Sequence, residues 1–147
     1  MSDRFNLERF VEAQAGVWGR VCAELRTGQK SSHWMWFVFP QVRGLGSSDM
    51  AMTYAISGRE EARAYLDHPV LGGRLRECAR IVMCIEGRTV EEIFGYPDDL
   101  KFHSSMTLFG EAAAPFAEVE GPAERVFHEA LKKYFGGKTD RGTLERI

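Results

Sequence analysis

His33 stands directly before the aromatic segment that begins at Trp34. An imidazole at the edge of a buried segment can serve as an acid or a base, or can donate a hydrogen bond to a ligand. The competing interpretation is structural, with the ring packed on the neighbouring tryptophan and bonded to the backbone. His33 is therefore a candidate for catalysis for which a structural role is an open alternative.

A second group of candidates follows the aromatic segment and combines an arginine with glycines and serines. Its members are Gln41, Arg43, Gly44, Gly46, Ser47 and Ser48. Glycines let backbone N–H groups approach an anion closely, and a guanidinium can pair with phosphate or carboxylate. The pattern is neither a Walker loop nor a dinucleotide-binding fingerprint. A plain connecting loop with a serine cap explains it equally well.

The third group lies further along the chain and has Asp99 and His103 at its centre. In a helix these two residues lie one turn apart, a spacing at which a carboxylate can orient an imidazole. One histidine with one or two aspartates does not make a zinc centre, so we predict no metal site and no cofactor. Alternatively, Asp98 and Asp99 complement the dipole of a helix that starts nearby.

Composition and charge narrow the class of protein. The chain has 147 residues, of which 44% are hydrophobic and 12% aromatic, as expected for one packed soluble domain. A net charge of −2 makes nucleic acid an unlikely partner. The apolar runs are too short to cross a membrane, and the N-terminus lacks the apolar core of a signal peptide. Three cysteines, Cys22, Cys78 and Cys84, form no C-x-x-C pair. Each lies among apolar residues, which suits free thiols in a reduced core, so we expect a cytoplasmic protein.

Apolar periodicity predicts the elements that must position these candidates. Steps of three, four and seven residues predict one long helix over residues 7–27, capped by Asn6 and ended by Gly28. Residues 33–39 suit a buried strand or a buried helix. We predict a short helix ended near Pro40, because no partner strand is visible elsewhere. The longer helices are expected to pack around residues 34–39.

The remaining pattern is helical throughout. Helices are predicted over residues 50–56, 57–66, 69–86, 90–94, from 97 and from 122, with capping boxes at Ser57–Glu60 and Thr89–Glu92 and an irregular loop over 112–121. The last ten residues are polar and either pack back or stay loose. The sum is an all-α protein whose residues 1–147 form a single compact domain of about six to eight helices.

Several motifs carry a resemblance to a known family. They are S-H-W-M-W-F-V-F-P-Q at 32–41, G-L-G-S-S at 44–48, Y-A-I at 54–56, E-A-x-x-Y-L-x-H-P-V-L-G at 61–72, F-G-Y-P-D-D-L-K-F-H-S-S-M-T-L-F at 94–109 and F-G-G-K-x-D at 135–140. In these motifs the chain resembles the bacterial family called Domain of Unknown Function 1810. The resemblance implies a mostly helical single domain and no established activity. Family members are sometimes labelled calpastatin, yet calpastatins are largely disordered, whereas this composition is that of a packed domain.

Two hypotheses about function follow from these residues. In the first, a small anionic or nucleotide-like ligand binds to a surface formed by Trp34, Trp36, Gln41, Arg43, Gly44 and Ser47. In the second, the aromatic surface is a non-catalytic module that receives a protein partner or a second copy of the chain. Whether the protein is an enzyme does not follow from the sequence, and convergence of His33, Arg43 and His103 on one cleft would favour catalysis.

Overall fold

A computed structural model describes residues 3–116 and 122–147 and shows an all-α protein with one core. Within these ranges the helices are α1 (Glu8–Ala15), α2 (Trp18–Arg26), α3 (Met35–Val38), α4 (Asp49–Thr53), α5 (Arg59–Asp67), α6 (Leu71–Met83), α7 (Val90–Phe94), α8 (Asp98–Ala113), the 3-10 helix η1 (Ala114–Phe116), α10 (Pro122–Phe135) and α11 (Arg141–Leu144). The predicted fold class is confirmed. None of the helices in the described ranges is long and apolar enough to cross a membrane.

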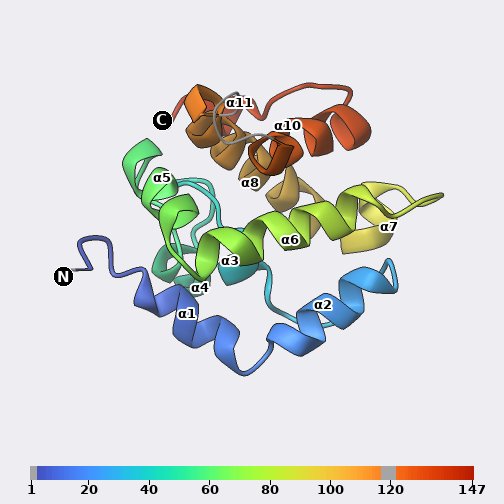
Figure 1. Ribbon diagram of the computed structural model, residues 1–147, viewed down its shortest axis with the longest axis horizontal. Helices are drawn as coiled ribbons and strands as arrows, with labels where there is room; N and C mark the ends of the chain where they lie inside the picture. The colour runs from blue at the N-terminus through green and yellow to red at the C-terminus, as the bar shows by residue number, and fades with distance from the viewer. Residues whose placement is uncertain (1–2, 117–121) are drawn as a thin grey trace.

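The helices are arranged around a buried central element. Helices α1 and α2 follow one edge of the molecule, α10 and α11 follow the opposite edge, and α6 crosses between them (Figure 1). The longest helix, α8, packs against α5, α7, α10 and α11. Eleven of its sixteen residues are buried, so it is surrounded by neighbours on nearly every side. The longer helices therefore pack around α8, and not around residues 34–39 as the sequence suggested.

Phe102 on α8 joins the aromatic segment to the rest of the core. Its ring centroid lies 5.1 Å from that of Phe39, which follows α3, and 4.7 Å from that of Phe94 on α7. Tyr134 and Phe135 of α10 contact the same ring at 6.4 and 6.3 Å. Such aromatic pairs each stabilise a core by roughly 1 kcal/mol beyond the area they bury. This cluster joins the aromatic segment to α7, α8 and α10, which come much later in the sequence.

The predicted helix over residues 7–27 is wrong in one respect, because it is broken in the middle. Helix α1 ends at Gly16, a weak helix former, and α2 begins after Val17. Buried Gln14 near the break donates hydrogen bonds to the Phe37 carbonyl oxygen at 2.7 Å and to the Tyr65 hydroxyl oxygen at 3.2 Å. The change of direction lets α1 and α2 bury separate faces against the core.

Two predicted helix starts are confirmed by their side-chain caps. Thr89 and Glu92 form the expected capping box, in which each side chain accepts a hydrogen bond from the backbone N–H of the other. Ser48 caps α4 by accepting from the N–H of Ala51 at 3.1 Å. These caps involve residues three positions apart, so the local sequence is sufficient to specify them.

Two other predicted caps are replaced by neighbouring carboxylates. Asn6 does not cap α1; instead the carboxylate of Asp3 accepts from the N–H groups of Leu7 and Glu8 at 2.7 and 2.9 Å. These bonds lower the pKa of Asp3.

The capping box predicted at Ser57 and Glu60 is also absent. Gly58 precedes α5, and the Ser57 N–H donates to Glu61 at 2.9 Å. Glu61 takes this role because its other carboxylate oxygen is already held in the interior by Arg9.

The helix boundaries in the second half mostly follow the sequence pattern. Helix α6 ends at Met83, three residues earlier than predicted, and α8 continues to Ala113 into the stretch expected to be a loop. Residues 117–121 of that predicted loop lie outside the described ranges. After α10, Asp140 caps α11 by accepting from the N–H and hydroxyl of Thr143, and it also accepts from Ser104 of α8.

The two glycines at the start of α6 provide a matched test of the packing between α5 and α6. A methyl group on Gly72 would lie 2.0 Å from the backbone carbonyl oxygen of Leu66, whereas one on Gly73 would meet nothing within 4 Å. We expect Gly72→Ala to lower the free energy of unfolding by about 2–4 kcal/mol, because backbone must move. Gly73→Ala should be neutral or stabilise by up to about 1 kcal/mol. Chemical denaturation measures both, and equal stabilities would contradict this packing.

Candidate functional site

The aromatic segment is anchored at its start by the buried carboxylate of Glu24 on α2. One carboxylate oxygen accepts from the backbone N–H groups of Ser31 and Ser32 at 2.8 and 3.0 Å and from the indole N–H of Trp34 at 2.9 Å. The other accepts from the Ser32 hydroxyl. Burial alone would raise the pKa of this carboxyl group, but these hydrogen bonds outweigh it and lower the pKa to about 2. Glu24 is therefore ionised and fully partnered.

This anchor places Trp34 in the core. The side chain is 1% exposed, its ring lies 6.3 Å from that of Phe39, and the ammonium nitrogen of Lys30 lies 5.1 Å from the indole ring. With its N–H bonded and its faces covered, Trp34 offers almost no surface to a ligand.

Trp36 is half-buried and lies beside a small network of ion pairs. The Lys101 ammonium lies 5.0 Å from the centroid of its ring. The same ammonium is 3.4 Å from one oxygen of Asp98, whose other oxygen is 2.8 Å from the Lys30 nitrogen. The side chain of Lys30 is 6% exposed, so this pair links the tryptophan segment to the first turn of α8 in the interior.

The three residues proposed for catalysis lie in different surroundings. His33 is exposed, and no described residue hydrogen-bonds to its ring. The His103 ring stacks on Phe135 with centroids 4.0 Å apart, and its Nε2 is 2.8 Å from the carbonyl oxygen of Lys138. Asp99 is largely buried, and no hydrogen bond joins it to His103; its Oδ1 has no partner among the described residues. The predicted carboxylate–imidazole pair is not formed.

Arg43 lines a hollow of about 410 Å³ beside α1 and α4. The parallel bridge between Val42 and Ile56 holds it there, because the Arg43 N–H donates to the Ile56 carbonyl oxygen at 2.8 Å. Residues 4–6 and Arg9 form one wall, and the end of α4 with Ala55 and Ser57 forms another. We call this site the arginine hollow.

Most acceptors in the arginine hollow are already used by Arg9. Its guanidinium donates to the carbonyl oxygens of Phe5, Asn6, Thr53 and Ala55 at 2.6 to 2.9 Å. It also pairs with the buried carboxylate of Glu61 at 2.9 Å. Arg9 is therefore a structural residue that ties the N-terminal segment to α4 and α5, and it neutralises the one carboxylate that lines the hollow.

Unlike Arg9, the other two arginines of the arginine hollow have guanidinium groups that are unpaired or only weakly paired. The Arg43 side chain is exposed, and no described residue pairs with its guanidinium. Arg4 forms an ion pair with Glu60 at 3.1 Å, but both side chains are more than 70% exposed, so this pair is weak. With Arg9 and Glu61 cancelling, Arg4 and Arg43 give the lining a charge of about +2. The lining is thus positively charged on a chain whose net charge is −2.

The other predicted ligand-binding residues do not line this hollow. Gln41 is half-buried, and its carbonyl oxygen accepts from the Ile56 N–H. Gly44 has a φ of +99°, and a methyl group on it would lie 2.8 Å from the Arg146 side chain, so the loop is closed against the C-terminal segment. Ser47 is exposed, beside the capping residue Ser48. Of the predicted group, Arg43 alone is part of the hollow.

Sequence reasoning missed Arg4 and Arg9, although both stand beside phenylalanines in the first ten residues. No local signal connects them to Arg43, because the bridge at Ile56 brings the segments together. Among the described residues, no group of three or more His, Cys, Asp or Glu side chains could hold a metal ion. Cys22 and Cys78 are buried as predicted, whereas Cys84, expected in the core, is exposed.

The comparisons with known proteins agree with this picture of the fold. A profile of the family described as "Protein of unknown function (DUF1810)" matches residues 4–147. The chain belongs to this family. The region matched by the DUF1810 profile includes the arginine hollow and the aromatic segment, and the description of the family names no activity. No match is found among curated proteins.

A solved DUF1810-like structure has the same fold. The protein is similar to the conserved hypothetical protein Rv1873 from Mycobacterium tuberculosis, at 55% sequence identity and a TM-score of 0.89. The likeness covers 97% of this chain and 96% of that one.

Because the pKa of Glu24 is lowered, we expect the stability of the protein to depend on pH in the acid range. Because the folded-state pKa of about 2 lies below the ordinary value of 4.5, this stabilisation is complete above pH 4.5 and is lost as the pH falls toward 2. This lowering of the pKa corresponds to about 3 kcal/mol. Glu24→Gln should lower the free energy of unfolding by about 2 kcal/mol at pH 7. Between pH 4.5 and pH 2 the stability of this variant should fall less steeply than that of the parent protein.

Urea denaturation between pH 2 and pH 7 measures this effect. Glu60→Gln is the matched control, because Glu60 is exposed in a surface ion pair. An unchanged pH slope in Glu24→Gln would show that Glu24 does not hold the tryptophan segment as described.

Proposed function

We propose that the protein binds a small anionic ligand of the phosphate or nucleotide class in the arginine hollow, with Arg43 as its main contact. The observation that carries this proposal is the exposed Arg43 guanidinium, which has no partner among the described residues and lines a hollow of about 410 Å³. A guanidinium presents two parallel N–H groups that match phosphate and carboxylate oxygens. The volume lies within the range of small-molecule sites.

The surroundings of Arg43 support a ligand larger than a single phosphate. Arg4 adds a second cation, and the side chains of Asn6, Thr53 and Ser57 are exposed polar groups on the same lining. Phe5 and Met52 provide apolar surface, and Met52 is 59% exposed. A nucleotide would place its phosphates near the arginines and its base against these apolar side chains. The base would thus meet Phe5 and Met52 rather than Trp34, which is buried.

We include no catalytic step in this proposal. Neither His33 nor His103 lines the hollow, and Asp99 lies at the start of α8 rather than beside Arg43. A cytoplasmic location, where phosphorylated metabolites are abundant, is part of the proposal.

The alternative of a protein-interaction module receives less support. It required an exposed aromatic surface at Trp34 or Trp36, and the first is buried while the second lies against Lys101. We therefore do not extend the proposal to a protein partner or to a homodimer.

Binding of pyrophosphate, AMP and ADP to the purified protein tests the proposal by calorimetry and by thermal shift. Arg43→Gln should raise the dissociation constant of the best of these probes at least about tenfold, because one charge-assisted contact contributes roughly 1.5–3 kcal/mol. Raised salt should weaken binding, since the hollow is open to solvent.

Arg20→Gln on α2 is the control, because it removes the same charge from an exposed position outside the hollow. If none of the three probes binds, or if Arg43→Gln and Arg20→Gln weaken binding equally, the arginine hollow is not the site.

A further inference from the structure

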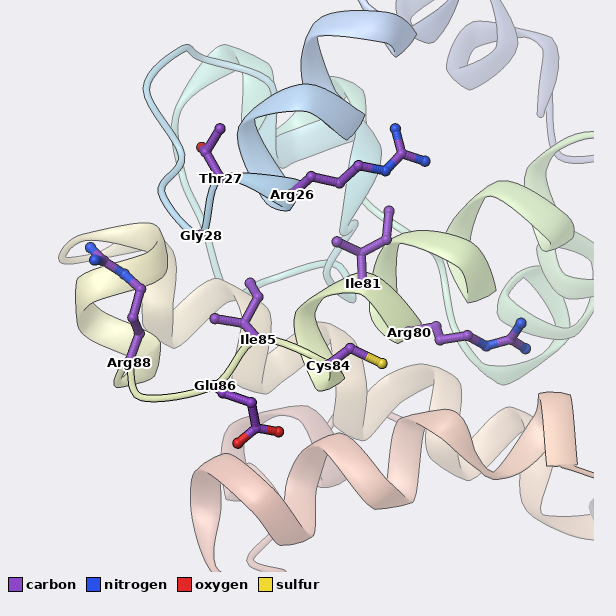
Figure 2. A pocket seen from close by; sticks show the side chains of 9 residues that line it. All are labelled: Arg26, Thr27, Gly28, Arg80, Ile81, Cys84, Ile85, Glu86 and Arg88. Carbon is purple, nitrogen blue, oxygen red and sulfur yellow. The ribbon is translucent and has the colours of Figure 1, made fainter.

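A second hollow lies on another part of the surface and shares no residue with the first. It has a volume of about 610 Å³ and lies between the end of α2 and the last turn of α6 with the residues that follow it. Thr27, Gly28, Ile81, Cys84 and Ile85 form its inner lining, and Arg26, Arg80, Glu86 and Arg88 lie around it. We call it the α2–α6 groove; Figure 2 shows its side chains.

The floor of the α2–α6 groove is apolar. Ile81 and Ile85 lie four residues apart and are half-buried, and both pack against the hydrophobic core. In Figure 2 they lie between Arg26 and Arg80 on one side and Arg88 on the other. Gly28 has a φ of +79°, which disfavours other residues, and a methyl group on it would lie 3.0 Å from the Arg88 side chain and 3.7 Å from that of Ile85. Apolar surface of Ile81 and Ile85 thus lines the groove between charged side chains.

The rim of the groove is positively charged. No described residue pairs with the Arg80 guanidinium, and Arg26 makes a 3.6 Å ion pair with Glu77 in which both side chains are more than half exposed. The Nε of Arg88 is buried without a hydrogen-bond partner among the described residues. Three arginines against Glu86 leave the rim with a charge of about +2.

Helix ends explain part of this arrangement but not all of it. Arg26 and Arg80 lie in the last turns of α2 and α6, where cations complement the helix dipole. That role requires neither a hollow nor half-buried isoleucines beside the arginines. An apolar floor with cations at one end is the arrangement that binds a molecule with an apolar body and an anionic head.

We propose that the α2–α6 groove binds an amphipathic carboxylate, such as a medium-chain fatty acid. Its hydrocarbon body covers Ile81 and Ile85, where the burial of apolar surface stabilises the complex. Its carboxylate pairs with the guanidinium of Arg80, which has no partner among the described residues, and with that of Arg26, whose surface ion pair is weak. This inference is independent of the arginine hollow, because the two sites have no residue in common.

Cys84 gives a direct reporter of occupancy. Its thiol is exposed and lines the groove, whereas Cys22 and Cys78 are buried. In Figure 2 its sulfur points to the side on which the Arg26 and Arg80 side chains extend. Alkylation by iodoacetamide, a small neutral reagent, can be followed at this residue by mass spectrometry.

The experiment titrates the full chain with octanoate and measures the rate of Cys84 alkylation. Octanoate should slow alkylation in a saturable way, whereas octanamide, which has the same body without the charge, should protect much less. Arg80→Gln should raise the octanoate concentration for half protection about tenfold. Each variant is compared with its own rate without octanoate, because the substitution also removes a charge near the thiol.

Arg43→Gln is the matched control, because it removes an exposed arginine from the other hollow. In this variant octanoate should protect Cys84 as well as it does in the parent protein. Three outcomes would overturn the proposal: no protection at millimolar octanoate, equal protection by octanamide, or unchanged half protection in Arg80→Gln. Loss of nucleotide binding in Arg43→Gln with intact octanoate protection would separate this site from the proposed function.

Discussion

A buried carboxylate with a complete set of donors fixes how the aromatic segment enters the fold. An ionised side chain removed from water must be matched by hydrogen bonds, or it destabilises the protein by several kcal/mol. Glu24 is matched by donors from Ser31, Ser32 and Trp34, which holds the turn between α2 and α3 in one conformation. The same turn places Lys30 so that it forms an ion pair with Asp98. The turn is thereby connected to the start of α8.

The position of α8 follows from this connection and from the aromatic cluster around Phe102. A helix buried on nearly all sides requires neighbours on every side, and α5, α7, α10 and α11 provide them. Residues that suggested chemistry in the sequence are largely used in this packing. Trp34 donates to Glu24 in the core, and His103 stacks on Phe135.

The two hollows illustrate how differently arginines can be used. Arg9 donates to four carbonyl oxygens and one carboxylate, so its guanidinium is fully occupied in joining three segments of the chain. The guanidinium groups of Arg43 and Arg80 have no partners among the described residues, and both residues line hollows. The distinction rests on hydrogen-bond partners rather than on residue type, which is why the six arginines that line the two hollows cannot be ranked from sequence.

Local sequence determined the helical class, the short helix at residues 35–38, the Thr89–Glu92 capping box and the family, because periodicity and caps depend on residues within a few positions of each other. Only the tertiary structure decided the break at Gly16, where Gln14 bonds to Phe37 and Tyr65 far along the chain. It also decided that Trp34 is core, that Asp99 and His103 remain apart, and that Arg43 meets Arg4 and Arg9. Each of these features depends on contacts between residues roughly ten to fifty positions apart. A local sequence pattern does not show which distant segment will provide the hydrogen-bond partner of a buried polar group.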